Sequence, residues 1–140
     1  MLKYIIILLL FQSLLLSTDL KIIITGIDSK KGNDILLAVY DSEESWLEDG
    51  KEVILIKKKV DSNIIEFEVK NLLESKYYAI SVFHDENADG ELNFSIFPPG
   101  PSEGVGVSND AKGFMGPPKY NDAKFIFDEE NKIITIKMIY

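Results

Sequence analysis

Short apolar stretches alternate with short polar ones along this chain. The pattern is clearest at 64–70, where Ile65, Phe67 and Val69 alternate with charged residues. A period of two is typical of a β-strand with one buried and one solvated face. Comparable apolar or β-branched stretches lie at 20–27, 35–40, 53–60, 77–84, 123–127 and 133–140.

These seven segments predict an all-β protein folded as a single antiparallel β-sandwich, since no stretch offers room for crossover helices. A length of 140 residues corresponds to one domain, which we expect to span residues 19–140. Residues 85–119 contain all five prolines of the chain and few alternating apolar residues. They predict a long Pro/Gly-rich loop, and a loop of this length in a compact domain is usually functional.

The N-terminal segment 1–18 has the pattern of a signal peptide. Lys3 precedes an apolar run at 4–16 that only Gln12 and Ser13 interrupt, and this run is shorter than the roughly 20 residues of a membrane span. We expect cleavage near Ser17 to Asp19 and an exported protein, periplasmic or extracellular or at the cell surface, with no membrane span left. An uncleaved anchor is the alternative, because Leu15 makes the cleavage site imperfect.

Composition narrows the chemistry further. The chain has no cysteine, which excludes disulfides, thiolate metal sites and a lipidated cysteine, so packing alone or packing with a bound ion must stabilise it. The net charge is −8, and every basic residue is a lysine. Nucleic-acid binding is therefore not expected. The expected partner is an extracytoplasmic ligand or protein that the sequence does not identify.

The segment 84–93 carries the most specific chemistry. Asp85, Asn87 and Asp89 place oxygen-bearing side chains at alternate positions, and Gly90 follows directly. Calcium binds six to eight oxygens supplied by a tightly curled backbone, and glycine permits the sharp turn at the sixth position of such a loop. Position twelve is Ile96 and no helices flank the segment, so it is not an EF-hand.

The sequence therefore predicts a structural Ca²⁺ site in a loop between strands. The expected side-chain ligands are completed by the Glu91 main-chain carbonyl and by Asn93 or Glu103. The alternative is a hairpin turn without metal, because Asp, Asn and Gly are also the residues that turns favour. The full set of candidate ligands is Asp85, Asn87, Asp89, Glu91, Asn93 and Glu103.

His84, the only histidine, is open to three interpretations. It could be a structural residue that donates to a loop oxygen, a metal ligand, or a general base acting with Ser108 or Ser102. The third would be a hydrolase centre, which also needs an orienting acid and an oxyanion hole. None of the common nucleophile, metalloprotease, P-loop or dinucleotide motifs occurs, so we do not predict an enzyme or a catalytic residue.

Aromatic residues offer a second kind of site. Trp46, the only tryptophan, either stacks on a sugar or covers an edge of the sandwich. The loop aromatics Phe94, Phe97, Phe114 and Tyr120 either line a ligand groove or fold back over an open end of the sandwich. These residues support the rival hypothesis of a carbohydrate- or small-ligand-binding module.

Three segments together resemble the DUF2141 family of bacterial exported proteins. They are 77–92 (YYAISVFHDENADGEL), 103–109 (EGVGVSN) and 116–118 (GPP) with 123–125 (AKF). The resemblance covers nearly all of residues 19–140 and implies an exported immunoglobulin- or transthyretin-like sandwich. It implies no particular activity. One departure bears on the metal hypothesis: Asn93 stands where the family commonly has an aspartate.

The sequence thus predicts an exported β-sandwich that serves as a binding or structural module and is stabilised by Ca²⁺. The ligand-binding module is the main alternative, and a hydrolase centred on His84 is the weaker one.

Overall fold

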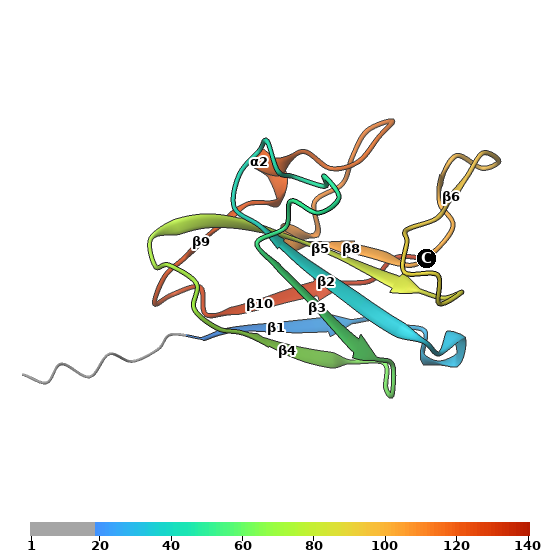
Figure 1. Cartoon of the computed structure of the whole chain (residues 1–140), viewed down its shortest axis with the longest axis horizontal. Coiled ribbons are helices and arrows are strands. Elements are labelled where there is room, and N and C mark those ends of the chain that lie inside the picture. Colours follow the sequence, from blue (N-terminus) through green and yellow to red (C-terminus); the bar gives the residue numbers. More distant parts are fainter. Residues whose placement is uncertain (1–18) are drawn as a thin grey trace, which may run out of the picture.

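The computed structural model describes residues 19–140, and the predicted signal peptide lies outside this range (Figure 1). Two short 3-10 helices (Ser29–Lys31 and Ser108–Asp110) and the one-turn helix α2 (Tyr120–Ala123) accompany the strands. Within the described range the strands are β1 (Leu20–Thr25), β2 (Asp34–Tyr40), β3 (Ile54–Lys59), β4 (Ile65–Val69), β5 (Lys76–Asp85), β6 (Phe94–Ser95), β7 (Gly100–Pro101), β8 (Val105–Val107), β9 (Phe125–Phe127) and β10 (Ile133–Lys137).

Two sheets form the sandwich, which confirms the predicted fold class. One sheet has the strand order β10-β1-β4 and the other β3-β2-β5-β8, with β9 also pairing with β5. Most pairs are antiparallel, but β1 and β10 run parallel from Lys21 opposite Ile133. The reason is the path of the chain: the turn after β9 brings it to the end of the sandwich where β1 begins, so β10 must run in the same direction.

The core follows from the alternation seen in the sequence. In β4 the apolar residues Ile65, Phe67 and Val69 are buried and the charged residues between them are exposed. β1 buries apolar residues beside them in the same sheet, and the central strands β2 and β5 of the other sheet face them across the core. Every buried side-chain nitrogen and oxygen in the described residues has a hydrogen-bond partner. Burial of apolar side chains therefore stabilises the sandwich without isolated polar groups in its interior.

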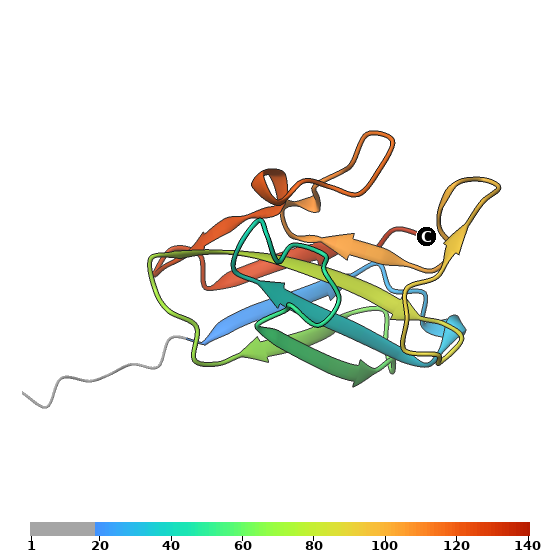
Figure 2. The same ribbon diagram turned by 45° about the horizontal axis from the view of Figure 1, so that its top comes forward.

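The long segment 85–119 is more ordered than the sequence predicted. It contains the small β6–β7 hairpin and β8, and β8 pairs with β5 as an additional strand of the sheet. The alternation of apolar and polar residues did not predict β8, because this strand is only three residues long and contains Gly106. The pairing of β8 divides the segment into two loops that project from the same side of the sandwich in both views (Figures 1 and 2).

Gly106 lies where the edges of the two sheets meet. A Cβ atom at this position would lie 2.8 Å from the Ile136 side chain and 3.2 Å from the Lys137 carbonyl oxygen, both on β10. Beside it, Val105 and Ile139 exchange two main-chain hydrogen bonds of 2.8 Å. The absent side chain thus permits the close approach of β8 to β10.

No helix among residues 19–140 is long and apolar enough to cross a membrane.

We expect Gly106→Ala to lower the free energy of unfolding by about 1–3 kcal/mol, because the added methyl group overpacks the junction of β8 and β10. Gly116→Ala is the matched control, since a Cβ atom there meets nothing within 4 Å. Urea unfolding monitored by Trp46 fluorescence would measure both variants. Equal stability of the two would show that the junction is not tightly packed.

Candidate functional site

The pairing of β5 with β8 builds the predicted site. Phe83 lies opposite Val105, and His84 donates its main-chain N–H to the Gly104 carbonyl at 2.8 Å. Continuing this register places Asp85, the last residue of β5, opposite Glu103. Both carboxylates are held at the end of a buried strand pair, with Asp85 1% and Glu103 7% exposed.

Asp85 organises the turn that follows it. Its carboxylate accepts hydrogen bonds from the main-chain N–H groups of Asp89 at 3.1 Å and Gly90 at 2.9 Å. Gly90 has a φ of +79°, a left-handed conformation that glycine adopts without steric cost. The predicted sharp turn at Gly90 is therefore confirmed, and it curls the loop back toward the end of β5.

The curled loop brings three predicted ligands together. One oxygen from each of Asp85, Asp89 and Glu103 lies within 4.8 Å of the other two. Calcium–oxygen distances of about 2.3–2.6 Å place ligands on opposite sides of an ion about 5 Å apart, so this spacing suits oxygens that share one cation. The five ion pairs recorded in the described residues involve none of these three carboxylates.

Asn87 and Asn93 flank Asp89 and form hydrogen bonds with it, and their role as ligands stays a prediction. Their side-chain N–H groups donate to Asp89 Oδ2 at 3.0 and 3.1 Å. The Asn87 side-chain oxygen accepts from the Asp89 main-chain N–H, and that of Asn93 accepts from Asn87. In this arrangement both amides act as hydrogen-bond partners of the Asp89 carboxylate.

Glu91 lies outside the carboxylate group. Its side chain is exposed, and its main-chain N–H donates to Asp89 Oδ1 at 2.9 Å. This contact and the amide contacts hold the pKa of Asp89 below its usual value of 3.8, with the Glu91 main-chain hydrogen bond as the largest cause. The role of the Glu91 carbonyl as a ligand stays a prediction.

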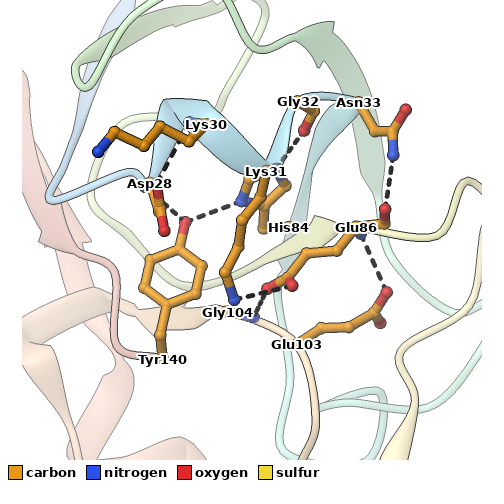
Figure 3. Close-up of polar contacts among 10 residues, drawn as sticks. All are labelled: Asp28, Lys30, Lys31, Gly32, Asn33, His84, Glu86, Glu103, Gly104 and Tyr140. Carbon is orange, nitrogen blue, oxygen red and sulfur yellow. Dashed lines mark hydrogen bonds and ion pairs between the residues drawn. The ribbon is translucent and has the colours of Figure 1, made fainter.

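Glu86, which the sequence analysis did not select, secures the base of the loop (Figure 3). Its carboxylate accepts from the Gly104 main-chain N–H at 3.0 Å and pairs with Lys31 at 2.8 Å. Reciprocally, Glu103 accepts from the Glu86 main-chain N–H at 3.0 Å and from that of Asn93, also at 3.0 Å. The two glutamates therefore tie both ends of the 86–103 loop together. The one signal in the sequence was the position of Glu86 between two predicted ligands, Asp85 and Asn87, which indicates that its side chain points away from theirs.

His84 is structural, as the first of the three interpretations held. Its side chain is fully buried, and its Nε2 contacts the Gly32 carbonyl oxygen while Nδ1 lies 2.8 Å from the Tyr140 hydroxyl. A carbonyl only accepts, so Nε2 carries a hydrogen. In the neutral ring Nδ1 then accepts from Tyr140, whose oxygen accepts in turn from the Asp28 main-chain N–H at 3.0 Å.

This network bears on the hydrolase hypothesis, which requires a ring nitrogen of His84 in contact with a serine. Both ring nitrogens of His84 have partners other than a serine. Ser108 is itself buried, where its hydroxyl donates to the Ala123 carbonyl and accepts from the Ile80 main-chain N–H. The hydroxyl of Ser108 therefore joins α2 to β5 and is held away from solvent.

The aromatic residues divide into two groups. Trp46 packs edge-on against Tyr40 and Tyr120, and its indole N–H donates to the Pro118 carbonyl at 2.8 Å. It therefore covers an edge of the sandwich, as one interpretation held, and Tyr120 folds back with it. Phe94, Phe97 and Phe114 do not fold back, since each is largely exposed.

We expect Tyr140→Phe to destabilise the protein by about 1–3 kcal/mol, because the buried His84 Nδ1 and the Asp28 N–H lose their shared partner. Burial raises the pKa of Tyr140 above its usual 10.0, so its hydroxyl stays protonated at neutral pH. Tyr77→Phe, at a half-exposed tyrosine, is the control and should change stability by less than about 0.5 kcal/mol. The ¹⁵N shifts of His84 should show an Nε2–H tautomer in the unmodified protein; an Nδ1–H tautomer would contradict the network.

The lowered pKa of Asp89 predicts a pH effect of definite sign. Because folding depresses the pKa, the stabilisation by charged Asp89 is present above about pH 4, the usual titration range of aspartate, and is lost as the pH falls through the folded-state pKa. Asp89→Asn should therefore reduce the decrease in melting temperature that accompanies a fall in pH below about 4. An NMR titration midpoint for the Asp89 carboxyl at or above 3.8 would refute the hydrogen-bonding pattern.

Comparison with known proteins gives one match. The model of a family described as an uncharacterized protein conserved in bacteria (DUF2141) matches residues 22–135. Searches of curated proteins and of solved structures gave no match. The match extends from within β1 to within β10 and includes the whole of the 85–104 loop. The chain therefore belongs to the DUF2141 family, as segments 77–92, 103–109 and 116–118 with 123–125 had indicated.

Proposed function

We propose that this protein is an exported β-sandwich module in which the loop 85–104 binds Ca²⁺ as a structural ion. The observation that carries the proposal is the convergence of Asp85, Asp89 and Glu103 within 4.8 Å. Three carboxylates at this separation repel one another, and a divalent cation between them would convert that repulsion into attraction. The oxygens also match the preference of calcium for hard ligands.

The carboxylates of Asp85 and Glu103 retain the capacity to bind an ion while they hold the loop, whereas that of Asp89 already accepts three hydrogen bonds. A carboxylate offers about four lone-pair sites. Asp85 and Glu103 each accept two main-chain hydrogen bonds, so about half of their acceptor sites remain for a cation. Main-chain carbonyls and water would complete a shell of six to eight oxygens.

The ion would act on the hairpin that follows the site. Glu103 and Asn93 form the base of the β6–β7 hairpin, where the Ser102 main-chain N–H donates to the Asn93 carbonyl at 2.9 Å. A cation held by Glu103, Asp85 and Asp89 would join this base to the end of β5. The biochemical role would then be to orient the hairpin, which makes the protein a binding or structural module.

Calcium should raise the melting temperature of the protein in scanning calorimetry. At ten times the dissociation constant, selective binding to the folded state adds about 1.4 kcal/mol, which corresponds to a rise of roughly 5 °C for a domain of this size. Asp89→Asn should remove most of this rise, and the double variant Asp85→Ala/Asp89→Ala should remove all of it. Magnesium at the same concentration should have a smaller effect, because it demands a tighter octahedral shell.

Glu91→Gln is the matched control, since it removes the same charge from the same loop at a side chain outside the carboxylate group. It should keep the calcium response. A full response in Asp89→Asn, or an equal loss in Glu91→Gln, would show that calcium acts through the general negative charge of the chain and would refute the proposed site.

A further inference from the structure

Two loops of the segment 85–119 carry apolar side chains at their tips. The first is the β6–β7 hairpin with its turn, residues 94–101, and the second is the loop 111–118 between β8 and α2. Their large apolar side chains are among the most exposed of the described residues: Phe94 69%, Ile96 88%, Phe97 94%, Phe114 93% and Met115 93%. Both loops project from the same side of the sandwich (Figure 2).

The fold does not need these side chains in its interior. The core between the sheets is complete without them, and the second cluster, around Ala79, Tyr120 and Ala123, is covered by Trp46. Exposed aromatic and aliphatic groups are unfavourable in water, roughly in proportion to their area. Exposed apolar groups gathered on one side of a molecule are typical of a surface that contacts a partner.

The backbone presents the tips in restricted conformations. Proline occupies three positions of the first tip and two positions of the second loop, which fixes φ at each. The base of the hairpin is closed by pairing of Phe94 with Pro101 and by the hydrogen bond from Ser102 to Asn93. Binding through restricted loops loses less conformational entropy than binding through flexible ones.

The charge within the tips differs in sign from the net charge of the whole chain. Residues 94–102 carry no charge, and residues 111–120 carry only Lys112 and Lys119, both exposed, although the chain has a net charge of −8. Of the acidic residues that directly adjoin the two segments in the chain, Glu103 is buried, and Asp110 accepts a hydrogen bond from the Lys137 main-chain N–H at 3.0 Å. The tips themselves are therefore apolar, and lysine is their only charged residue type.

We propose that the two tips insert into the surface of an anionic lipid bilayer and that Lys112 and Lys119 contact its headgroups. The tips are separate and convex, and their large side chains lack polar groups. A bilayer accepts such side chains without shape complementarity, whereas a protein partner would need two matched pockets. Aromatic and aliphatic anchors beside lysines are the usual pattern of proteins that lie on a membrane surface. The proposal does not depend on calcium.

Vesicle sedimentation of the full chain, with calcium chelated throughout, tests the proposal. The vesicles contain phosphatidylcholine either alone or mixed with phosphatidylglycerol. We expect the unmodified protein to prefer the mixed vesicles. Phe97→Ser and Phe114→Ser should each weaken partitioning by about tenfold or more, since each removes one inserted aromatic side chain.

Two further variants separate the apolar and the electrostatic contributions. Lys112→Gln/Lys119→Gln should remove most of the preference for phosphatidylglycerol, with a loss of roughly fivefold for each lysine. Leu73→Ser changes a side chain that is 66% exposed in the loop between β4 and β5, and it should partition like the unmodified protein. All variants share the same N-terminus, so residues 1–18 cannot produce the differences.

Two results would overturn the proposal. The first is partitioning of Phe97→Ser and Phe114→Ser equal to that of Leu73→Ser. The second is a concentration-dependent dimer in analytical ultracentrifugation that the two phenylalanine variants abolish while no form of the protein binds vesicles. In that case the tips would contact a second copy of the chain.

Discussion

The pairing of β8 with β5 is the interaction on which the rest of this structure depends. It adds a strand to the larger sheet and brings that sheet's edge against β10, where Gly106 leaves room for the approach. The same register continues beyond the strands and places Asp85 opposite Glu103. A packing interaction within the fold thus creates the carboxylate cluster at its end.

Polar contacts of His84 and Asp85 hold the end of the sandwich where β5 ends. These contacts cost little conformational entropy because both residues belong to a strand. His84 and Asp85 are consecutive in β5, and their side chains lie on opposite faces of the sheet. His84 is directed inward to Tyr140 and Gly32, while Asp85 is directed to the turn at Gly90. One strand end therefore anchors both the C-terminus of the chain and the acidic loop.

The segment 85–119 combines a well-supported base with exposed tips. At its base, Glu103 accepts a hydrogen bond from the Glu86 main-chain N–H, and Glu86 accepts one from the Gly104 main-chain N–H. The loop therefore enters and leaves the sheet in a defined direction. At its tips, Phe97 and Phe114 have no intramolecular partners that bury them. Such a division is expected of a loop that contacts a partner, because the base of the loop provides stability and the exposed tips provide recognition.

The sequence by itself determined the β-sandwich, the alternating core of strands such as 64–70, and the oxygen-rich turn at Asp85–Gly90. These are local properties, because strand periodicity and turn chemistry are encoded by neighbouring residues. The sequence left open where Glu103 lies relative to Asp85 and which contacts His84 and Trp46 make. Only the tertiary structure decided these points and revealed β8 and Glu86, since they depend on strand register and on contacts between residues distant in the chain. Long-range pairing is a property of the whole fold, and no short pattern of residues contains it.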